Sequence, residues 1–380
     1  MRTMRYAALG LVITLSVLAA GCATATGNNT NSTASATPAV AKDSPAAVDA
    51  SKGSTTEVPA ETLPTVPNFV PKDTRVVVNI PAFRMDVFKD GSLVKSYKVG
   101  IGYPAFPLPT GVRKAEMIIF NPTWTPPDEP WAAHMKNVSV GEPVPAGSRL
   151  NPLGPIKIPI GAPSLIHGGK PLAKIGTFAS HGCVGLTNAQ VQDFAKVLAE
   201  AAGTELSDGT IQSYFRNRTR TQVVKLNQIV PVELRYETIV VEDGTLHIYR
   251  DVYNQDTNTE GNLRAVLEAS GMKLEELGEA ERAQVLEALN AMSRHPLKQN
   301  VTSKAGSKPS NTAVPSSSPT DATNATDRVE TASVKKPINK NQKEVVIELA
   351  ALKGKGYPAA MNLNTGAGKP ATVVVAKSVR

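Results

Sequence analysis

Cysteine, aromatic side chains and long hydrophobic runs are all scarce in this chain of 380 residues. Its 2 cysteines cannot build a disulfide framework, and they cannot form a cysteine-based structural zinc site without histidine ligands. Aromatic residues make up 5% and charged residues 19% of the chain, and the composition excludes collagen, a coiled coil and a multi-span membrane protein. What is present is 29 prolines, 28 glycines and a net charge of +8, which indicate rigid loops and segments outside any packed core.

The first cysteine, Cys22, closes a segment that is typical of an export signal. Two arginines precede a mostly apolar run at 6–20, which is too short for a comfortable membrane span. The small residues at 19–21 resemble a bacterial lipobox, which implies cleavage before Cys22 and lipidation of its thiol; an ordinary cleaved signal is the alternative. We therefore expect a lipid-anchored envelope protein, with its folded part in the periplasm or outside the cytoplasmic membrane and away from nucleic acid.

The rest of the chain alternates between patterned and unpatterned parts. Short strands joined by Asp-Gly turns and by Pro- and Gly-rich loops predict a strand-rich domain, with one helix at Asn188–Ala202 that Asn188 caps. After this domain comes a segment with helical spacing of apolar residues, and then a segment rich in Ser, Thr and Pro. We expect a signal peptide at 1–21, a flexible tether at 22–72, the strand-rich domain at 73–253, a small helical region at 258–297, a disordered linker at 298–343 and a short β-like tail at 344–380.

The second cysteine, Cys183, closes the segment Ser180-His181-Gly182-Cys183, just before the predicted helix. A free thiol in an oxidising compartment is a liability unless it is buried or used. A nucleophilic cysteine needs a base, which His167 or His181 can supply. On a strand, the spacing of two residues places His181 and Cys183 on one face. Three interpretations remain open: a nucleophile, an inert buried thiol, and a metal site formed by Cys183 with both histidines.

Two motifs together resemble the signature of the L,D-transpeptidases with a YkuD-type catalytic domain. Ser180-His181-Gly182-Cys183 is preceded by His167-Gly168, with twelve residues between His167 and Ser180. The upstream segments, among them Pro109-Thr110-Gly111 and Asn121-Pro122-Thr123-Trp124, resemble the same family in order and spacing. The resemblance covers residues 73–253. It implies a mostly β fold, a β-sandwich or barrel with one helix near the nucleophile.

The resemblance also implies a reaction. Cys183 attacks a peptidoglycan tetrapeptide stem, terminal D-Ala leaves, and the acyl group passes to an amine acceptor, with no cofactor and no metal. The implied roles are Cys183 as nucleophile, His167 as general base and acid, the Gly168 carbonyl as the group that orients His167, the Gly182 and Cys183 N–H groups as an oxyanion hole, His181 as support for the site and Ser180 as a brace for the loop.

One position departs from the family pattern. Arginine is common two residues after the nucleophile, and this chain has Gly185 there. Lys170 or Lys174 is a candidate replacement that binds a stem carboxylate, and solvated loop charge is the alternative. Trp124 beside a Pro-rich loop is a candidate wall for the substrate, and packing of that loop against the sheet is the alternative.

Three further functions stay open at this stage. The same residues suit attachment of an envelope protein to the wall and hydrolysis of the stem as an L,D-carboxypeptidase. A wall-binding scaffold with a degenerate site is the alternative of a different class, and Gly185 together with the long linkers motivates it.

Overall fold

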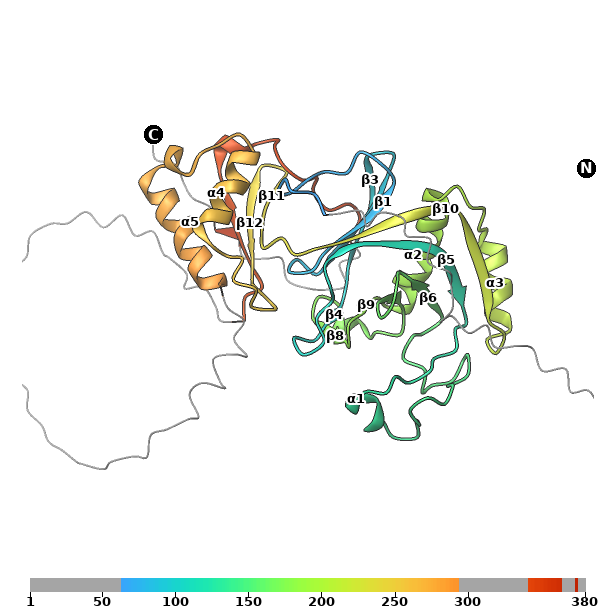
Figure 1. Cartoon of the computed structure of the whole chain (residues 1–380). Helices are drawn as coiled ribbons and strands as arrows, with labels where there is room; N and C mark the ends of the chain where they lie inside the picture. The colour runs from blue at the N-terminus through green and yellow to red at the C-terminus, as the bar shows by residue number, and fades with distance from the viewer. Residues whose placement is uncertain (1–62, 294–340, 364–372, 375–380) are drawn as a thin grey trace, which may run out of the picture. The chain divides into compact units, whose positions relative to one another are not determined.

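The computed structural model describes residues 63–293, 341–363 and 373–374, which all belong to one unit of the chain, Glu57–Arg380 (Figure 1). The predicted signal peptide, the predicted lipidation site Cys22, and most of the predicted tether and linker lie outside the described residues. No helix within the described ranges is long and apolar enough to cross a membrane. The described part is mostly β, which confirms the predicted fold class.

A mixed sheet of eight strands, in the order β3-β2-β1-β10-β5-β6-β7-β9, is the framework of the larger domain. These strands are β1 Arg75–Asn79, β2 Arg84–Lys89, β3 Ser92–Lys98, β5 Gly111–Phe120, β6 Ile156–Pro159, β7 Leu165–His167, β9 Val184–Gly185 and β10 Gln222–Arg235. β1 runs parallel to β10 and β7 runs parallel to β9. Two further short strands, β4 (Ile101–Gly102) and β8 (Phe178–Ser180), pair with each other. The parallel β7–β9 pair brings together the two motifs that carry the family resemblance.

Helix α2 (Asn188–Ala201) covers the core of this domain. Val191, Phe194 and Leu198 share one face of the helix and are fully buried in a cluster with side chains of β6 and β10. Each such side chain contributes about 1.5–3 kcal/mol through burial. The apolar spacing that predicts this helix therefore corresponds to its contact with the sheet.

The start of α2 differs from the sequence prediction. The N-cap is Thr187 rather than Asn188, because Thr187 and Gln190 exchange the two hydrogen bonds of a capping box. The Asn188 side chain instead accepts a hydrogen bond of 2.8 Å from the backbone N–H of Gly169. Asn188 therefore ties the start of the helix to the segment that follows β7.

Two helices of this domain have no clear signal in the sequence. α3 (Asp208–Arg216) begins at Ser207, whose side chain accepts from the Thr210 N–H, and it buries Ile211 against the sheet. α1 (Pro130–Ala133) is a single turn in the long loop between β5 and β6. A 3₁₀ turn, Leu172–Lys174, lies between β7 and β8.

A second, four-stranded sheet has its own core. Its strands are β11 Ile239–Glu242, β12 Thr245–Tyr249, β13 Glu344–Glu348 and β14 Val373–Val374, in the order β11-β12-β13-β14. Two helices, α4 (Glu260–Ala269) and α5 (Glu279–Met292), pack on it, and 3₁₀ turns lie at Leu274–Glu276 and Ala350–Leu352. The β11–β12 hairpin, placed by the sequence analysis in the domain at 73–253, therefore shares its core with the helices and with β13.

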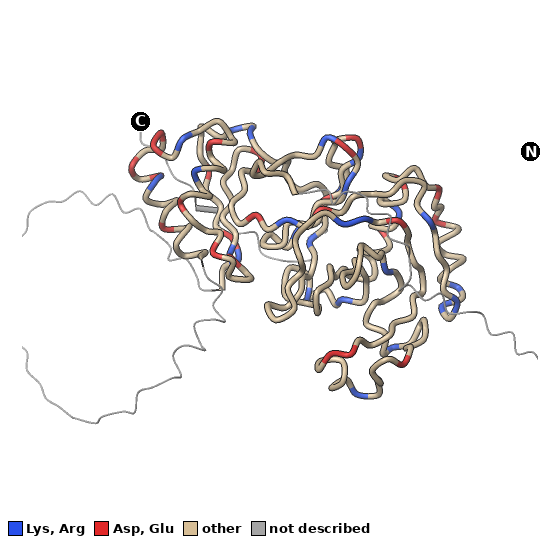
Figure 2. The backbone as a smooth tube through the Cα atoms, viewed as in Figure 1, with Lys and Arg blue, Asp and Glu red and all other residues tan. Residues whose placement is uncertain are grey.

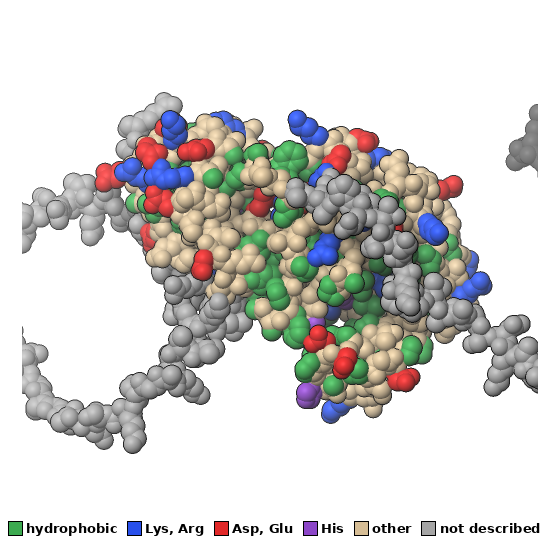
Figure 3. Space-filling model, viewed as in Figure 1, with side chains coloured by type: hydrophobic (Ala, Val, Ile, Leu, Met, Phe, Trp, Pro, Cys, Tyr) green, Lys and Arg blue, Asp and Glu red, His purple; other side chains and the backbone are tan. Residues whose placement is uncertain are grey.

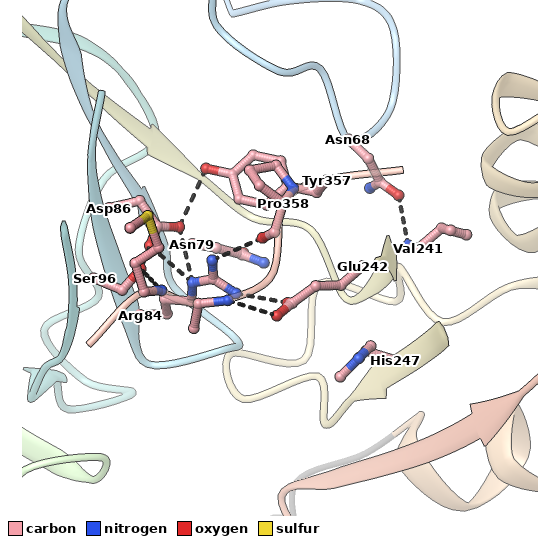
Figure 4. Close-up of polar contacts among 12 residues, drawn as sticks. Asn68, Asn79, Arg84, Asp86, Ser96, Val241, Glu242, His247, Tyr357 and Pro358 are labelled. Atoms are coloured by element: carbon pink, nitrogen blue, oxygen red, sulfur yellow. Dashed lines mark hydrogen bonds and ion pairs between the residues drawn. The ribbon is translucent and has the colours of Figure 1, made fainter. Parts of the chain in front are cut away.

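The segment after β13 returns to the larger domain (Figure 4). Tyr357 packs in a cluster with Phe88 of β2, and its hydroxyl donates a hydrogen bond to Asp86 at 3.2 Å. Arg84 donates to Asp86 at 2.9 Å, to Glu242 of β11 at 2.6 Å and to the Pro358 carbonyl at 3.1 Å. Since Arg84 is buried, loss of the 357–358 segment or of β11 would leave part of its guanidinium without a partner.

Candidate active site

Cys183 lies in a tight turn between β8 and β9, and within the described residues it is the free cysteine. The turn, residues 181–183, is not a strand, so the expectation that His181 and Cys183 share one strand face is wrong. Gly182 has a φ of +94°, which L side chains rarely adopt. Ser164, a residue the sequence analysis did not single out, donates its hydroxyl to the Gly182 carbonyl at 2.9 Å. The turn is therefore held by the residue that directly precedes β7.

Ser180 holds the other side of the turn. Its Oγ donates to the Cys183 carbonyl at 2.6 Å and accepts from the Cys183 N–H at 3.0 Å. These two hydrogen bonds close the turn, and they occupy one of the two N–H groups expected in an oxyanion hole. Within the described part of the chain, the Gly182 N–H has no hydrogen-bond partner. Gly182 is thus the donor that remains available beside the thiol.

His167 ends strand β7 and is buried, with 3% of its surface exposed. Its Nδ1 lies 2.7 Å from the Gly168 carbonyl oxygen. A carbonyl oxygen only accepts, so Nδ1 carries the proton and Nε2 of the neutral ring holds the lone pair. Burial and then the charge of Lys170 lower the pKa of His167 from 6.5 to about 3, against backbone hydrogen bonds to Gly168 and Leu153. The ring is therefore neutral near pH 7 and can accept a proton.

Strand register brings the two motifs together. Ile166 of β7 pairs with Val184 of β9, and His167 pairs with Gly185. Cys183 therefore directly precedes Val184, which pairs with Ile166, the neighbour of His167 on β7. A hydrogen bond from the Leu165 backbone and the charge of Lys170 favour the thiolate, but burial is the larger effect and raises the pKa of Cys183. At rest, a neutral thiol thus lies beside the strand that ends in a neutral imidazole.

Lys170 lies against Gly185, the position where the family pattern has arginine. A Cβ added at Gly185 would lie 2.8 Å from Lys170 Cγ and 3.0 Å from Cε, so the glycine leaves room for the lysine stem. Burial lowers the pKa of Lys170, while the nearby Cys183 thiol opposes this change. Within the described residues the ammonium group forms no ion pair with a carboxylate. Lys170 is therefore a half-buried cation beside the thiol.

His181 is exposed on the turn and surrounded by aromatic rings. The Trp131 ring stacks on it with centroids 4.0 Å apart and planes at 4°, and Phe106 and Tyr103 lie at 4.8 Å and 5.3 Å. Figure 3 shows histidine side chains where the loop that carries α1 meets the rest of the domain. Burial and then the Lys170 charge lower the pKa of His181. This loop therefore forms one wall of the site.

The structure places Trp124 behind this wall. Trp124 is 8% exposed and packs with Val144 and Leu153. This position corresponds to packing of the loop, the alternative to a substrate contact. The tryptophan that contacts His181 is Trp131. The described residues contain no group of three or more histidine, cysteine or acidic side chains arranged to hold a metal. The arrangement suits acyl transfer, because it combines a thiol, a ring nitrogen able to accept a proton, an available backbone N–H and a cation.

Residues 73–224 match the YkuD family model, which describes the L,D-transpeptidase catalytic domain. This match agrees with the resemblance that the two motifs indicate, and it lies within the larger domain. No match to the chain is found among curated proteins.

Several solved structures are similar to the chain at low identity. One is the catalytic domain of an E. faecium L,D-transpeptidase, with 17% identity, a TM-score of 0.28 and coverage of 43% of this chain and 98% of that one. An L,D-transpeptidase from Mycobacterium smegmatis has 16% identity, a TM-score of 0.26, and coverage of 43% and 58%. L,D-transpeptidase 3 from Mycobacterium tuberculosis, with a faropenem-derived adduct, has 16% identity, a TM-score of 0.25, and coverage of 43% and 60%.

Proposed function

We propose that the protein is a cysteine L,D-transpeptidase that acts on peptidoglycan stem peptides in the cell envelope. The observation that supports this best is the position of Cys183 beside β7, whose last residue, His167, keeps its Nδ1 proton on the Gly168 carbonyl. This arrangement leaves Nε2 as the base. A protein that only binds the wall as a scaffold requires neither a buried neutral histidine nor a thiol held directly before the adjacent strand β9.

In the first half-reaction, the Cys183 sulfur attacks the carbonyl carbon of the third residue of a tetrapeptide stem. The thiol proton moves to His167 Nε2 as the carbon–sulfur bond forms. The bond to D-Ala then breaks, and His167 returns the proton to the leaving amine. Because both groups rest neutral, proton transfer accompanies attack instead of preceding it.

In the second half-reaction, an amine attacks the thioester. His167 takes a proton from that amine as the carbon–nitrogen bond forms. The carbon–sulfur bond then breaks, and His167 returns the proton to the Cys183 sulfur. The tetrahedral oxyanion of each half-reaction is stabilised by the available N–H of Gly182, while Ser180 holds the turn and Trp131 keeps the His181 ring in place. No cofactor enters this scheme.

Lys170 supplies the cation for a carboxylate of the stem. It is half-buried beside the thiol without an acidic partner among the described residues, and an incoming carboxylate gives it one. Substrate contact by Trp124 would require the α1 loop to move, since that ring is buried. We propose that Trp131, rather than Trp124, is the aromatic side chain that contacts the substrate.

The acceptor decides the biological outcome. Another stem yields a cross-link, an envelope protein yields attachment to the wall, and water yields an L,D-carboxypeptidase. Lipidation of Cys22 would hold the enzyme at a membrane from which its tether reaches the wall.

The test supplies the purified enzyme with a tetrapeptide stem and an amine acceptor, and follows both D-Ala release and the joined product. We expect both products from the wild type and neither from Cys183→Ala. Release of D-Ala without a joined product would assign hydrolysis. If no D-Ala is released and deletion of the gene leaves the muropeptides unchanged, the scaffold is the correct function.

A further inference from the structure

A pocket in the larger domain borders Gly169, which follows the residue that orients His167. It has a volume of about 480 Å³. It is lined by residues of the 147–155 segment, by Gly169 after β7, by the first turns of α2, and by the end of α3. Neither Cys183 nor Lys170 lines it. Gly154, Gly169 and Asn188 pack so closely that a Cβ at Gly154 would lie 2.3 Å from the Gly169 nitrogen and 2.7 Å from Asn188 Oδ1. The pocket is therefore a separate site that shares one wall with the active site.

The pocket is basic. Arg149 and Arg218 line it, and its lining contains no aspartate or glutamate. Within the described part of the chain, neither guanidinium forms an ion pair or hydrogen bond. Figure 2 shows the concentration of basic residues at the turn between α3 and β10. Two arginines without an acidic partner among the described residues are suited to an oxyanion, since each guanidinium presents a planar fork of donors.

Two asparagines hold in place the segments that carry the arginines: Asn121, which is buried, and Asn151, which is half-buried. Asn121 is 4% exposed, adopts a φ of +46° and directs its Nδ2 to the carbonyls of Tyr214, Asn217 and Arg220. These contacts fix the turn that carries Arg218. On the other wall, Asn151 donates to the Pro122 carbonyl at 2.8 Å and accepts from the Leu153 N–H at 3.0 Å. The pocket is thus preorganised, which lowers the entropy cost of binding.

The remaining lining is suited to a sugar. Gln192 and Gln212 line the pocket, and no other described residue forms a hydrogen bond with their side-chain amides. Phe215 lines it as well and is half-buried, so part of its ring is available to the apolar face of a pyranose. Amides recognise hydroxyl and acetamido groups, and the arginines recognise the anion.

We propose that this pocket, defined by Arg149, Arg218, Gln192, Gln212 and Phe215, binds an acidic saccharide: a sugar that carries a carboxylate or a phosphate. Such a group occurs on the acidic amino sugars and on the phosphorylated polymers of an envelope. The site goes beyond the proposed acyl transfer and does not depend on it. A saccharide bound there contacts Gly169, the residue that follows the Gly168 carbonyl on which His167 is oriented.

The test measures binding of three probes to the mature full chain by saturation-transfer NMR and calorimetry: N-acetylmuramic acid, N-acetylglucosamine 6-phosphate and neutral N-acetylglucosamine. We expect at least one acidic sugar to bind about tenfold more tightly than the neutral sugar. The tighter of the two acidic sugars identifies a carboxylate or a phosphate source. Equal binding of all three, or no binding, overturns the proposal.

A pair of variants with equal charge change separates the pocket from general surface charge. Arg149→Gln with Arg218→Gln should weaken the acidic sugar about tenfold or more. Arg216→Gln with Arg220→Gln removes the same charge from the α3–β10 turn, outside the pocket lining, and should leave binding unchanged. Equal losses in both double variants overturn the proposal. Unaltered thermal melting shows that each variant is folded, and stem acylation of Cys183 reports separately on the proposed enzyme.

Discussion

The side chain of Lys170 fills the space beside Gly185, so close that a Cβ on Gly185 would lie 2.8 Å from Lys170 Cγ. A cation can therefore reach the thiol from the segment after β7, although the strand position itself is glycine. The same charge acts to lower the pKa of Cys183, His167 and His181. Lys170 is thus placed to influence both substrate binding and the reactivity of the thiol.

Lys170→Met should raise the KM for the stem about 10- to 150-fold, because it removes a charge-assisted hydrogen bond worth about 1.5–3 kcal/mol. It should also raise the pH at which iodoacetamide alkylates Cys183, since the Lys170 charge lowers the thiol pKa. Lys174→Met is the matched control, because Lys174 is exposed on the neighbouring 3₁₀ turn. If both variants behave alike, Lys170 has no special role.

The pH profile of kcat/KM tests the protonation state of His167. The reaction needs a neutral ring, and the pKa of His167 is lowered to about 3 by burial. We expect no inflection near 6.5 and loss of activity only as the pH falls toward about 3, measured as far as the fold survives. His167→Ala should slow acylation by about 10²–10⁴-fold. An acid limb near 6.5 would assign the proton to a different, exposed group.

Tryptophan fluorescence tests the stacking of Trp131 on His181. A protonated imidazole in contact with the indole ring quenches its emission, and burial lowers the pKa of His181 below its ordinary 6.5. As the pH is lowered, tryptophan emission should therefore fall, with its midpoint at a pH below 6.5. The chain has 2 tryptophans, which makes the control simple. Trp131→Phe should remove the titration and Trp124→Phe should retain it; the reverse result would contradict the geometry.

Tyr357 should stabilise the larger domain from the far end of the chain. Its hydroxyl bonds to Asp86 and its ring packs on Phe88. In urea unfolding, Tyr357→Phe should cost about 1 kcal/mol and Tyr357→Ala about 3–5 kcal/mol. Met361→Ala is the control, because Met361 is 42% exposed. Truncation after residue 253 should destabilise the domain; an unchanged midpoint would show that the returning segment is dispensable.

Local signals predicted much of this structure. The β2–β3 hairpin follows from the Asp90-Gly91 turn, and α2 follows from the spacing of Val191, Phe194 and Leu198. The sequence alone does not distinguish Thr187 from Asn188 as the cap of α2, because both are good capping residues. The hydrogen bond from the Gly169 N–H to Asn188 is a tertiary contact that no local pattern indicates.

Features that depend on distant parts of the chain could not be predicted in this way. Cys183 lies on a turn in which Gly182 adopts a positive φ and accepts a hydrogen bond from Ser164, which is 18 residues earlier in the chain. β13 completes the second sheet only through pairing with β12, which no local pattern indicates. The position of Lys170 over Gly185 arises because the segment after β7 returns beside β9, and a sequence motif does not encode a side-chain path of this kind.

Intact-mass measurement of the acyl-enzyme tests the central claim most directly. Wild-type protein incubated with a tetrapeptide stem and no acceptor should gain the mass of the stem less that of D-Ala, and an amine acceptor should remove the added mass. Cys183→Ala should gain nothing. The same mass gain on Cys183→Ala, or none on a folded wild-type protein that is given its stem, would contradict the account.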